Sequence, residues 1–112
     1  MDTNSLLTAI TERANDIKAL DLVVIDMDGK SAITEYLVIC HGTSTAHTQG
    51  IADNISLTLK KSDVLPLGVE GMGEGRWILM DYNSVIVHIF LEDVREEYSI
   101  EEIYNAYPKR ES

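Results

Sequence analysis

Cysteines, prolines and long apolar runs are all scarce in this sequence of 112 residues. The single cysteine, Cys40, has no second cysteine with which to form an internal disulfide, so we expect a reducing, cytoplasmic environment. The longest apolar run, from Val85 to Leu91, is interrupted by His88 and is too short for a transmembrane helix. The chain begins Met1-Asp2-Thr3-Asn4 without a basic segment, so we also expect no secretory or organellar targeting signal.

Basic residues are few, with 9 Lys and Arg against 19 Asp and Glu, which gives a net charge of -10 at pH 7. Such a chain is repelled by phosphate backbones, so we expect little or no direct contact with nucleic acid. The densest acidic stretch surrounds Arg95 and comprises Glu92, Asp93, Glu96, Glu97, Glu101 and Glu102. Either a basic protein partner or a merely solvated helix face would account for this stretch.

The hydrophobic pattern predicts the order helix, strand, strand, helix, strand, strand, strand, helix. Apolar residues at helical spacing predict a first helix within residues 3–20, and runs rich in Val and Ile predict strands at 22–26 and 36–40. The second helix should start after the hydroxyl-rich turn 42–45 and end at Lys60-Lys61, as capping and the helix dipole favour.

The remaining elements are marked by turn and cap residues. Residues 66–69 predict a short edge strand, because Pro66 cannot donate to a central ladder. Strands at 77–82 and 85–90 flank a two-residue turn at Asn83-Ser84. Ser99 and Glu102 form a capping box, and Tyr98 and Ile103 occupy the positions of a hydrophobic staple, so the last helix should begin at Ser99.

The hairpin turn fixes which side chains share a face of the sheet. It pairs Trp77 with Phe90, Leu79 with His88 and Asp81 with Ile86. The opposite face is apolar apart from one tyrosine and suits a core; it carries Ile78, Met80, Tyr82, Val85, Val87 and Ile89. The face with Trp77 mixes aromatic, apolar and titratable groups, which is typical of an interaction surface, although a covering helix would also account for it.

The candidates for catalysis are weak. Asp26-x-Asp28 has the spacing with which nucleotidyltransferases hold magnesium, but Gly29 after Asp28 also suits a plain turn. The glycine-rich segment 68–75 has the wrong spacing for a phosphate loop and leads into a strand, so it predicts a mobile or tightly turning connection. Cys40 and His41 point to opposite faces of a strand, and the sequence has no zinc-ligand pair, so we expect no cofactor, no metal site and no enzyme.

Several motifs follow one another in a fixed order along the chain. They are Asp28-Gly29-Lys30-Ser31-Ala32-Ile33-Thr34, Val38-Ile39-Cys40-His41-Gly42-Thr43-Ser44-Thr45-Ala46-His47, Ile51-Ala52-Asp53, Pro66-Leu67-Gly68-Val69-Glu70-Gly71, Trp77-x-x-x-Asp81, Val85-Ile86-Val87-His88 and Arg95-x-x-Tyr98-x-Ile100-Glu101. With these motifs the sequence resembles the ribosomal silencing factor S family, also called the Iojap-like proteins. The resemblance extends from the first helix to Tyr107.

This resemblance implies a single α/β domain over residues 1–112, with a mixed five-stranded sheet flanked by helices, a nucleotidyltransferase-like topology and a disordered tail at 108–112. It also implies a cytoplasmic repressor of translation that binds the large ribosomal subunit through its protein number fourteen and blocks joining of the small subunit when nutrients are limiting. The implied partner contacts are Glu70, Trp77, Asp81, His88, Phe90, Arg95 and Tyr98, with Trp77 and Tyr98 the foremost.

Two other interpretations remain open at this point. One is a metal-dependent nucleotidyltransferase-like enzyme that uses Asp26 and Asp28. The other is a homodimer in the free state, formed through the face that carries Trp77.

Overall fold

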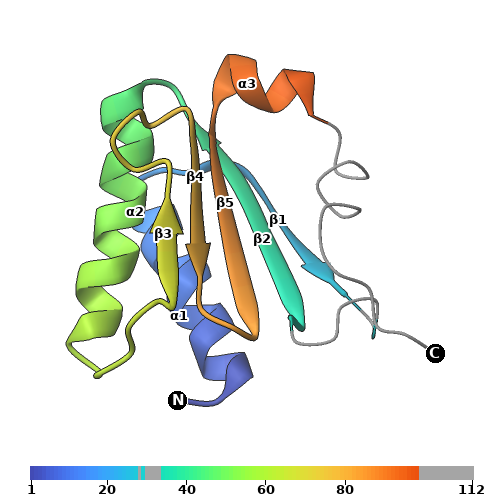
Figure 1. The fold of residues 1–112 in the computed structure, drawn as a ribbon, viewed down its shortest axis with the longest axis vertical. Coiled ribbons are helices and arrows are strands. Elements are labelled where there is room, and N and C mark those ends of the chain that lie inside the picture. Colours follow the sequence, from blue (N-terminus) through green and yellow to red (C-terminus); the bar gives the residue numbers. More distant parts are fainter. Residues whose placement is uncertain (28, 30–33, 99–112) are drawn as a thin grey trace.

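The computed structural model describes residues 1–27, 29 and 34–98, and these form one layer of helices on a five-stranded sheet (Figure 1). The first seven elements follow the predicted order. The elements are α1 (Thr3–Asp16), β1 (Leu20–Asp26), β2 (Tyr36–Gly42), α2 (Thr45–Lys60), β3 (Gly68–Glu70), β4 (Trp77–Asp81), β5 (Val85–Leu91) and α3 (Glu92–Glu97).

The sheet is mixed, as expected, with the strand order β1-β2-β5-β4-β3. Its central pair, β2 and β5, is parallel, and the three other pairs are antiparallel. The predicted hairpin register is confirmed, because Trp77 lies opposite Phe90, Leu79 opposite His88 and Asp81 opposite Ile86. Every side chain of the hairpin therefore lies on the face that the turn predicts.

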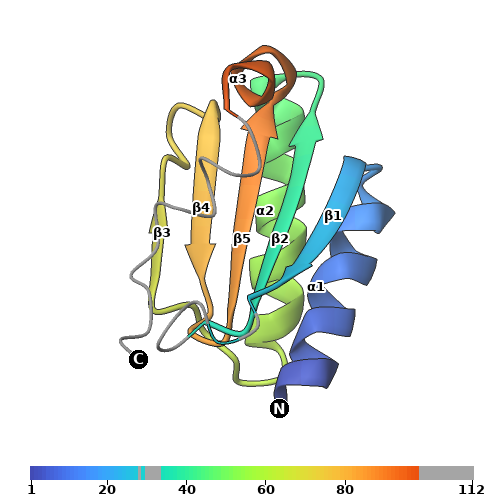
Figure 2. The ribbon, with the colours of Figure 1, turned by 90° about the vertical axis from the view of Figure 1, so that its right-hand side faces the viewer.

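Helices α1 and α2 cover one face of the sheet, and α3 lies across the end of β5 (Figure 2). The main core lies between the two long helices and this face. It combines Ile10 of α1 and Ile55 of α2 with the predicted apolar side of the hairpin. The hydroxyl of Ser44 caps α2 by accepting a hydrogen bond from the His47 amide at 3.1 Å, as the hydroxyl-rich turn predicts.

Several boundaries differ from the prediction. Strand β1 begins at Leu20 instead of residue 22, and β3 comprises Gly68–Glu70 instead of residues 66–69. Helix α1 ends at Asp16 instead of reaching residue 20, because Lys18 has a left-handed φ of 57° and the chain turns there into β1. A helix that was not predicted, α3, starts directly after β5, and Tyr98 follows it in an extended conformation with φ of -121°. The predicted helix start at Ser99, with its partners Glu102 and Ile103, lies outside the described residues, as does the tail at 108–112.

No helix in the described ranges is both long and apolar enough to cross a membrane.

The hydroxyl of Tyr82 is buried on the helix-covered side and has no hydrogen-bond partner within the part of the chain that the structure describes. Burial also raises the pKa of this hydroxyl to about 12. We expect Tyr82→Phe to raise the free energy of unfolding by about 1 kcal/mol, because it removes an unsatisfied buried group and keeps the ring. Urea unfolding at pH 7 measures this change, with Tyr36→Phe as the matched control on a partly exposed ring. A lower free energy of unfolding for Tyr82→Phe than for the wild type, with Tyr36→Phe unchanged, would contradict this prediction.

Candidate partner-binding surface

An aromatic cluster lies on the sheet face opposite α1 and α2, at the end of the sheet where α3 sits. Trp77 comes from β4, His88 and Phe90 come from β5, and Tyr98 follows α3. The Trp77 ring centroid is 4.8 Å from that of Phe90 and 4.8 Å from that of Tyr98. Phe90 and His88 are themselves stacked with ring centroids 6.0 Å apart. Four of the seven predicted contact residues therefore form one cluster.

Two rings of this cluster are accessible to solvent, and the other two are buried beneath them. Phe90 is fully buried and His88 is 2% exposed, whereas Trp77 is half-buried and Tyr98 is 37% exposed. Both buried rings stand under Trp77 and cannot reach a partner in this conformation. The accessible part of the cluster consists of Trp77 and Tyr98, the two residues with the strongest expectation.

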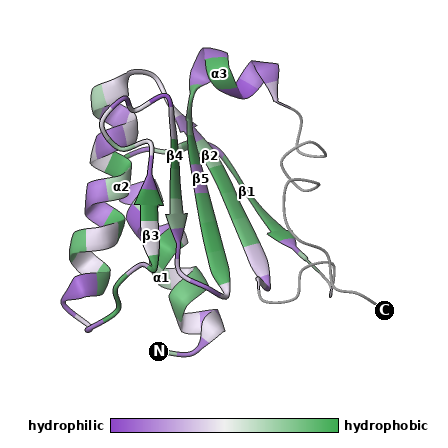
Figure 3. Cartoon of the chain, in the orientation of Figure 1, coloured by the Kyte–Doolittle hydropathy of each residue, from purple (hydrophilic) through white to green (hydrophobic). Residues whose placement is uncertain are grey.

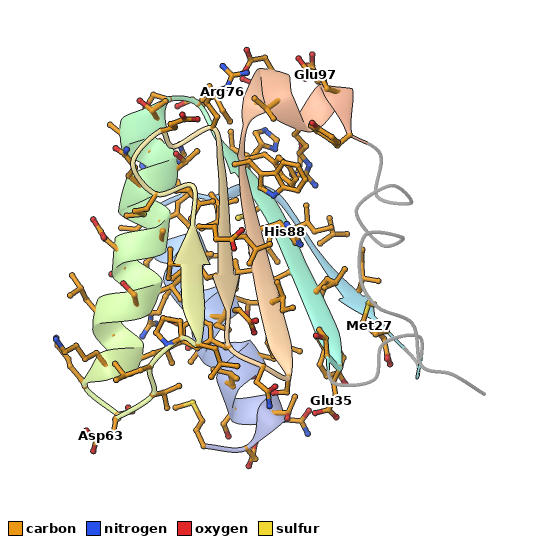
Figure 4. The ribbon with its side chains drawn as sticks, in the orientation of Figure 1. Met27, Glu35, Asp63, Arg76, His88 and Glu97 are labelled. Atoms are coloured by element: carbon orange, nitrogen blue, oxygen red, sulfur yellow. The ribbon has the colours of Figure 1, made fainter. Side chains whose placement is uncertain are left out.

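A hydrogen bond holds the Trp77 indole in place. Its Nε1–H donates to Nδ1 of His88 over 2.9 Å, so this ring nitrogen is an acceptor. His88 lies in the middle of β5 (Figure 4), between Ile39 of β2 and Leu79 of β4. Burial in these surroundings lowers the pKa of His88 from 6.5 to about 4. His88 is therefore neutral at pH 7, as the hydrogen bond from Trp77 requires.

Arg95 is bound within the protein. Its Nη1 donates to Nδ1 of His41 at 2.7 Å and to the carbonyl oxygen of Leu20 at 3.2 Å. His41 is buried and lies beside Phe90 in the parallel β2–β5 pair. The guanidinium thus ties α3 to β1 and β2, and it fixes the end of α3 from which Tyr98 projects. His41 was missed as a site residue, because its contact with Arg95 spans 54 positions and leaves no local signal.

The acidic residues of α3 remain at the surface. Exposed carboxylates surround Arg95 along the helix, namely Glu92, Asp93, Glu96 and Glu97. The other two members of the predicted acidic stretch, Glu101 and Glu102, lie outside the described residues. An anionic helix therefore borders the aromatic cluster.

Glu70 and Asp81 lie on the same sheet face but further from the rings. Glu70 is exposed on β3 opposite Leu79, which in turn lies opposite His88. Asp81 is at the far end of β4 from Trp77, and its Oδ1 accepts a 2.7 Å hydrogen bond from the Asn83 amide in the hairpin turn. Asp81 thus has a structural role in the turn, and the structure does not bring it to the cluster.

The segment between β3 and β4 is a tight, anchored turn. Gly71 and Gly75 have φ of 78° and 70°, and the Gly75 amide donates to the Gly71 carbonyl at 3.0 Å. Helix α2 fixes the turn, because Thr48 Oγ1 donates to the Gly75 carbonyl at 2.6 Å and Gln49 Nε2 donates to the Met72 carbonyl at 3.0 Å. Of the two forms predicted, the tightly turning connection is the one observed.

The features considered for catalysis lie apart from this cluster. Asp26 ends β1, and Asp28 lies outside the described residues. Among residues 1–27, 29 and 34–98 there is no group of three His, Cys, Asp or Glu side chains that could hold a metal ion. Burial raises the pKa of the Cys40 thiol to about 12, so this cysteine is not a thiolate nucleophile at pH 7.

Comparisons with known proteins find a matching family and similar sequences. The family model described as "Ribosomal silencing factor during starvation" matches residues 1–112. The ribosomal silencing factor RsfS of Bacillus subtilis is 33% identical over 108 residues, which cover 96% of this chain and 92% of the relative. The corresponding protein of Haemophilus influenzae is 36% identical over 100 residues, which cover 89% of this chain and 98% of the relative.

The fold also has solved counterparts and more distant relatives. A crystal structure of a Chromobacterium violaceum protein superposes with a TM-score of 0.87 at 27% identity, covering 100% of this chain and 92% of the other. A mouse protein named "Mitochondrial assembly of ribosomal large subunit protein 1" is 30% identical over 90 residues, which cover 77% of this chain and 39% of the relative.

Proposed function

Because this chain belongs to the family of ribosomal silencing factors, we propose that it binds the large ribosomal subunit through the subunit's protein number fourteen and prevents the small subunit from joining. Bound in this way, it represses translation when nutrients are limiting. The name of the mouse relative refers to the large ribosomal subunit, which supports the large subunit as the partner proposed here. The starvation role follows from the description of the family.

The observation that carries the proposal is the pair formed by Trp77 and Tyr98. The two accessible rings have centroids 4.8 Å apart, and both pack on the buried ring of Phe90, so contacts within the protein orient the pair before a partner arrives. Aromatic side chains of this kind dominate the binding energy of protein interfaces. Here Trp77 and Tyr98 contact the partner, while His88, Phe90 and Arg95 hold them in position.

Charge supports a protein partner of basic character. The carboxylates of α3 border the aromatic pair, Glu70 lies further away on the same sheet face, and the whole chain has a net charge of -10. Complementary charges steer association and make it dependent on salt. A ribosomal protein surface rich in Lys and Arg fits this border better than bare ribosomal RNA does.

Co-sedimentation with isolated large subunits, small subunits and joined ribosomes tests the proposal. We expect the wild type to sediment with large subunits only and to reduce subunit joining. Trp77→Ala should weaken binding by about 2 kcal/mol or more, as for a buried hot spot. Tyr98→Ala should weaken binding by about 1 kcal/mol or more, with less risk to the fold because Tyr98 lies at the end of α3.

The control is Leu57→Ala, which removes an exposed apolar side chain from α2, the helix on the other side of the sheet. Circular dichroism checks that each variant is folded. If folded Trp77→Ala and Tyr98→Ala proteins bind large subunits as tightly as Leu57→Ala does, the aromatic pair is not the anchor. Association with no ribosomal particle would refute the function itself.

A further inference from the structure

Exposed apolar side chains concentrate near β3, away from the aromatic cluster. The described residues contain eight large hydrophobic side chains that are exposed, and four of them lie between the last turns of α2 and β3. These are Leu57, Leu65, Leu67 and Val69, with Leu67 at 74% exposure. Figure 3 shows β3 near α2, with both hydrophobic and hydrophilic residues along the strand. Exposed apolar side chains that gather in one part of a fold commonly mark an interaction site.

A groove between α2 and the edge of the sheet adjoins this region and shares Val69 with it. It has a volume of about 290 Å³ and is lined by Ala52, Asp53, Ser56, Val69, Met72 and Met80. Its lining is mostly apolar, and Asp53 places one exposed carboxylate in it. The groove therefore suits an apolar side chain with a cation next to it.

The edge of β3 borders the same groove. In the described sheet β3 pairs with β4 alone, so the outer side of this strand faces no other strand. Such an edge can accept an extended segment through main-chain hydrogen bonds. Side chains alternate along β3, so Val69 lies on the α2 side opposite Met80, and Glu70 lies on the other side opposite Leu79.

We propose that the β3 edge and this groove form a second docking site, which takes an extended segment of a partner protein with alternating apolar and basic residues. Added beside β3, the segment places its apolar side chains in the groove on the α2 side. Its basic side chains then lie on the side of Glu70. The acidic net charge of -10 favours such a partner and disfavours a second copy of this chain.

This site goes beyond the proposed ribosome contact. Val69 and Asp53 lie on the α2 side of the sheet, whereas Trp77 and Tyr98 lie on the other side. Glu70 lies on the same side as Trp77 but further from the rings, so the two sites share this face but not the groove. Substitutions in the groove and in the aromatic pair therefore test the two sites separately.

The test uses the blocked peptide Val-Lys-Val-Lys-Val and the full chain labelled with ¹⁵N. We expect saturable shifts of the amide signals of residues 68–70 and Ala52. Asp53→Asn should weaken binding about threefold, as for one exposed charge pair. Val69→Lys should weaken it at least tenfold, because it puts a charge in the groove. The matched control Glu12→Gln removes an exposed charge from α1 and should change nothing, and Trp77→Ala should bind the peptide as the wild type does.

Three results would overturn the proposal. The first is the absence of shifts in β3 at saturating peptide. The second is equal binding of the peptide Val-Glu-Val-Glu-Val, which would remove the role of charge. The third is a set of β3 shifts that grow with protein concentration in the absence of peptide, which would assign the edge to pairing between copies of this chain.

Discussion

Gly71→Ala is expected to lower the free energy of unfolding by about 3 kcal/mol. A methyl group at this position would lie 2.0 Å from the carbonyl oxygen of Trp77, so the backbone has to move. Gly71 also has a φ of 78°, which an L-residue with a side chain adopts only under strain. Since the displaced atom belongs to Trp77, this substitution should weaken large-subunit binding as well.

Urea unfolding followed by tryptophan fluorescence measures this effect, because Trp77 is the only tryptophan in the sequence. The matched control is Gly73→Ala in the same turn, where an added methyl group meets no atom within 4 Å. We expect the Gly73 variant to stay within about 0.5 kcal/mol of the wild type. Equal unfolding midpoints for the two variants would show that the contact with Trp77 does not constrain the turn.

Acidification from pH 7 to pH 4 is expected to cost the native state about 3 kcal/mol through His88 alone. The pKa of this group falls from 6.5 to about 4 on burial, so between these values the unfolded chain binds a proton that the folded chain does not. The contribution of His88 to the free energy of unfolding is fully present above pH 6.5. It decreases as the pH falls from 6.5 to 4 and changes no further below pH 4.

The control for this pH dependence is His88→Gln. Glutamine cannot titrate, yet its side-chain oxygen can still accept the hydrogen bond from Trp77 Nε1. We expect the difference in stability between wild type and variant to shrink or reverse as the pH is lowered from 7 to 4. Parallel stability curves for the two proteins would exclude His88 as the titrating group.

The hairpin was predictable because its geometry is local. A two-residue turn at Asn83-Ser84 sets the register, and alternation then assigns Trp77 and Phe90 to one face without further information. The same local reasoning predicted that α2 is capped within the hydroxyl-rich turn 42–45, and Ser44 is the residue that caps it. Short-range rules therefore predicted the two strands of the candidate surface.

Two features of the surface could not be predicted in this way. Helix α3 begins after Leu91, which makes no side-chain capping hydrogen bond, so the usual start signal is missing. Only the carboxylates of its first turn, Glu92 and Asp93, hinted at a helix there. The burial of Phe90 and the Arg95–His41 contact depend on β2 pairing with β5, and no short-range pattern encodes that pairing.

The position of β5 in the sheet also orders the folding of the chain. Without β5 the sheet is two separate pieces, β1 with β2 and β3 with β4, because β5 stands between β2 and β4. Closing it requires a pairing between residues about 49 positions apart, such as Tyr36 and Val85, which is a slow step compared with hairpin formation. Trp77 has no Phe90 or His88 beneath it until this last strand is in place. A chain whose synthesis has not passed β5 and α3 thus cannot present the finished aromatic cluster.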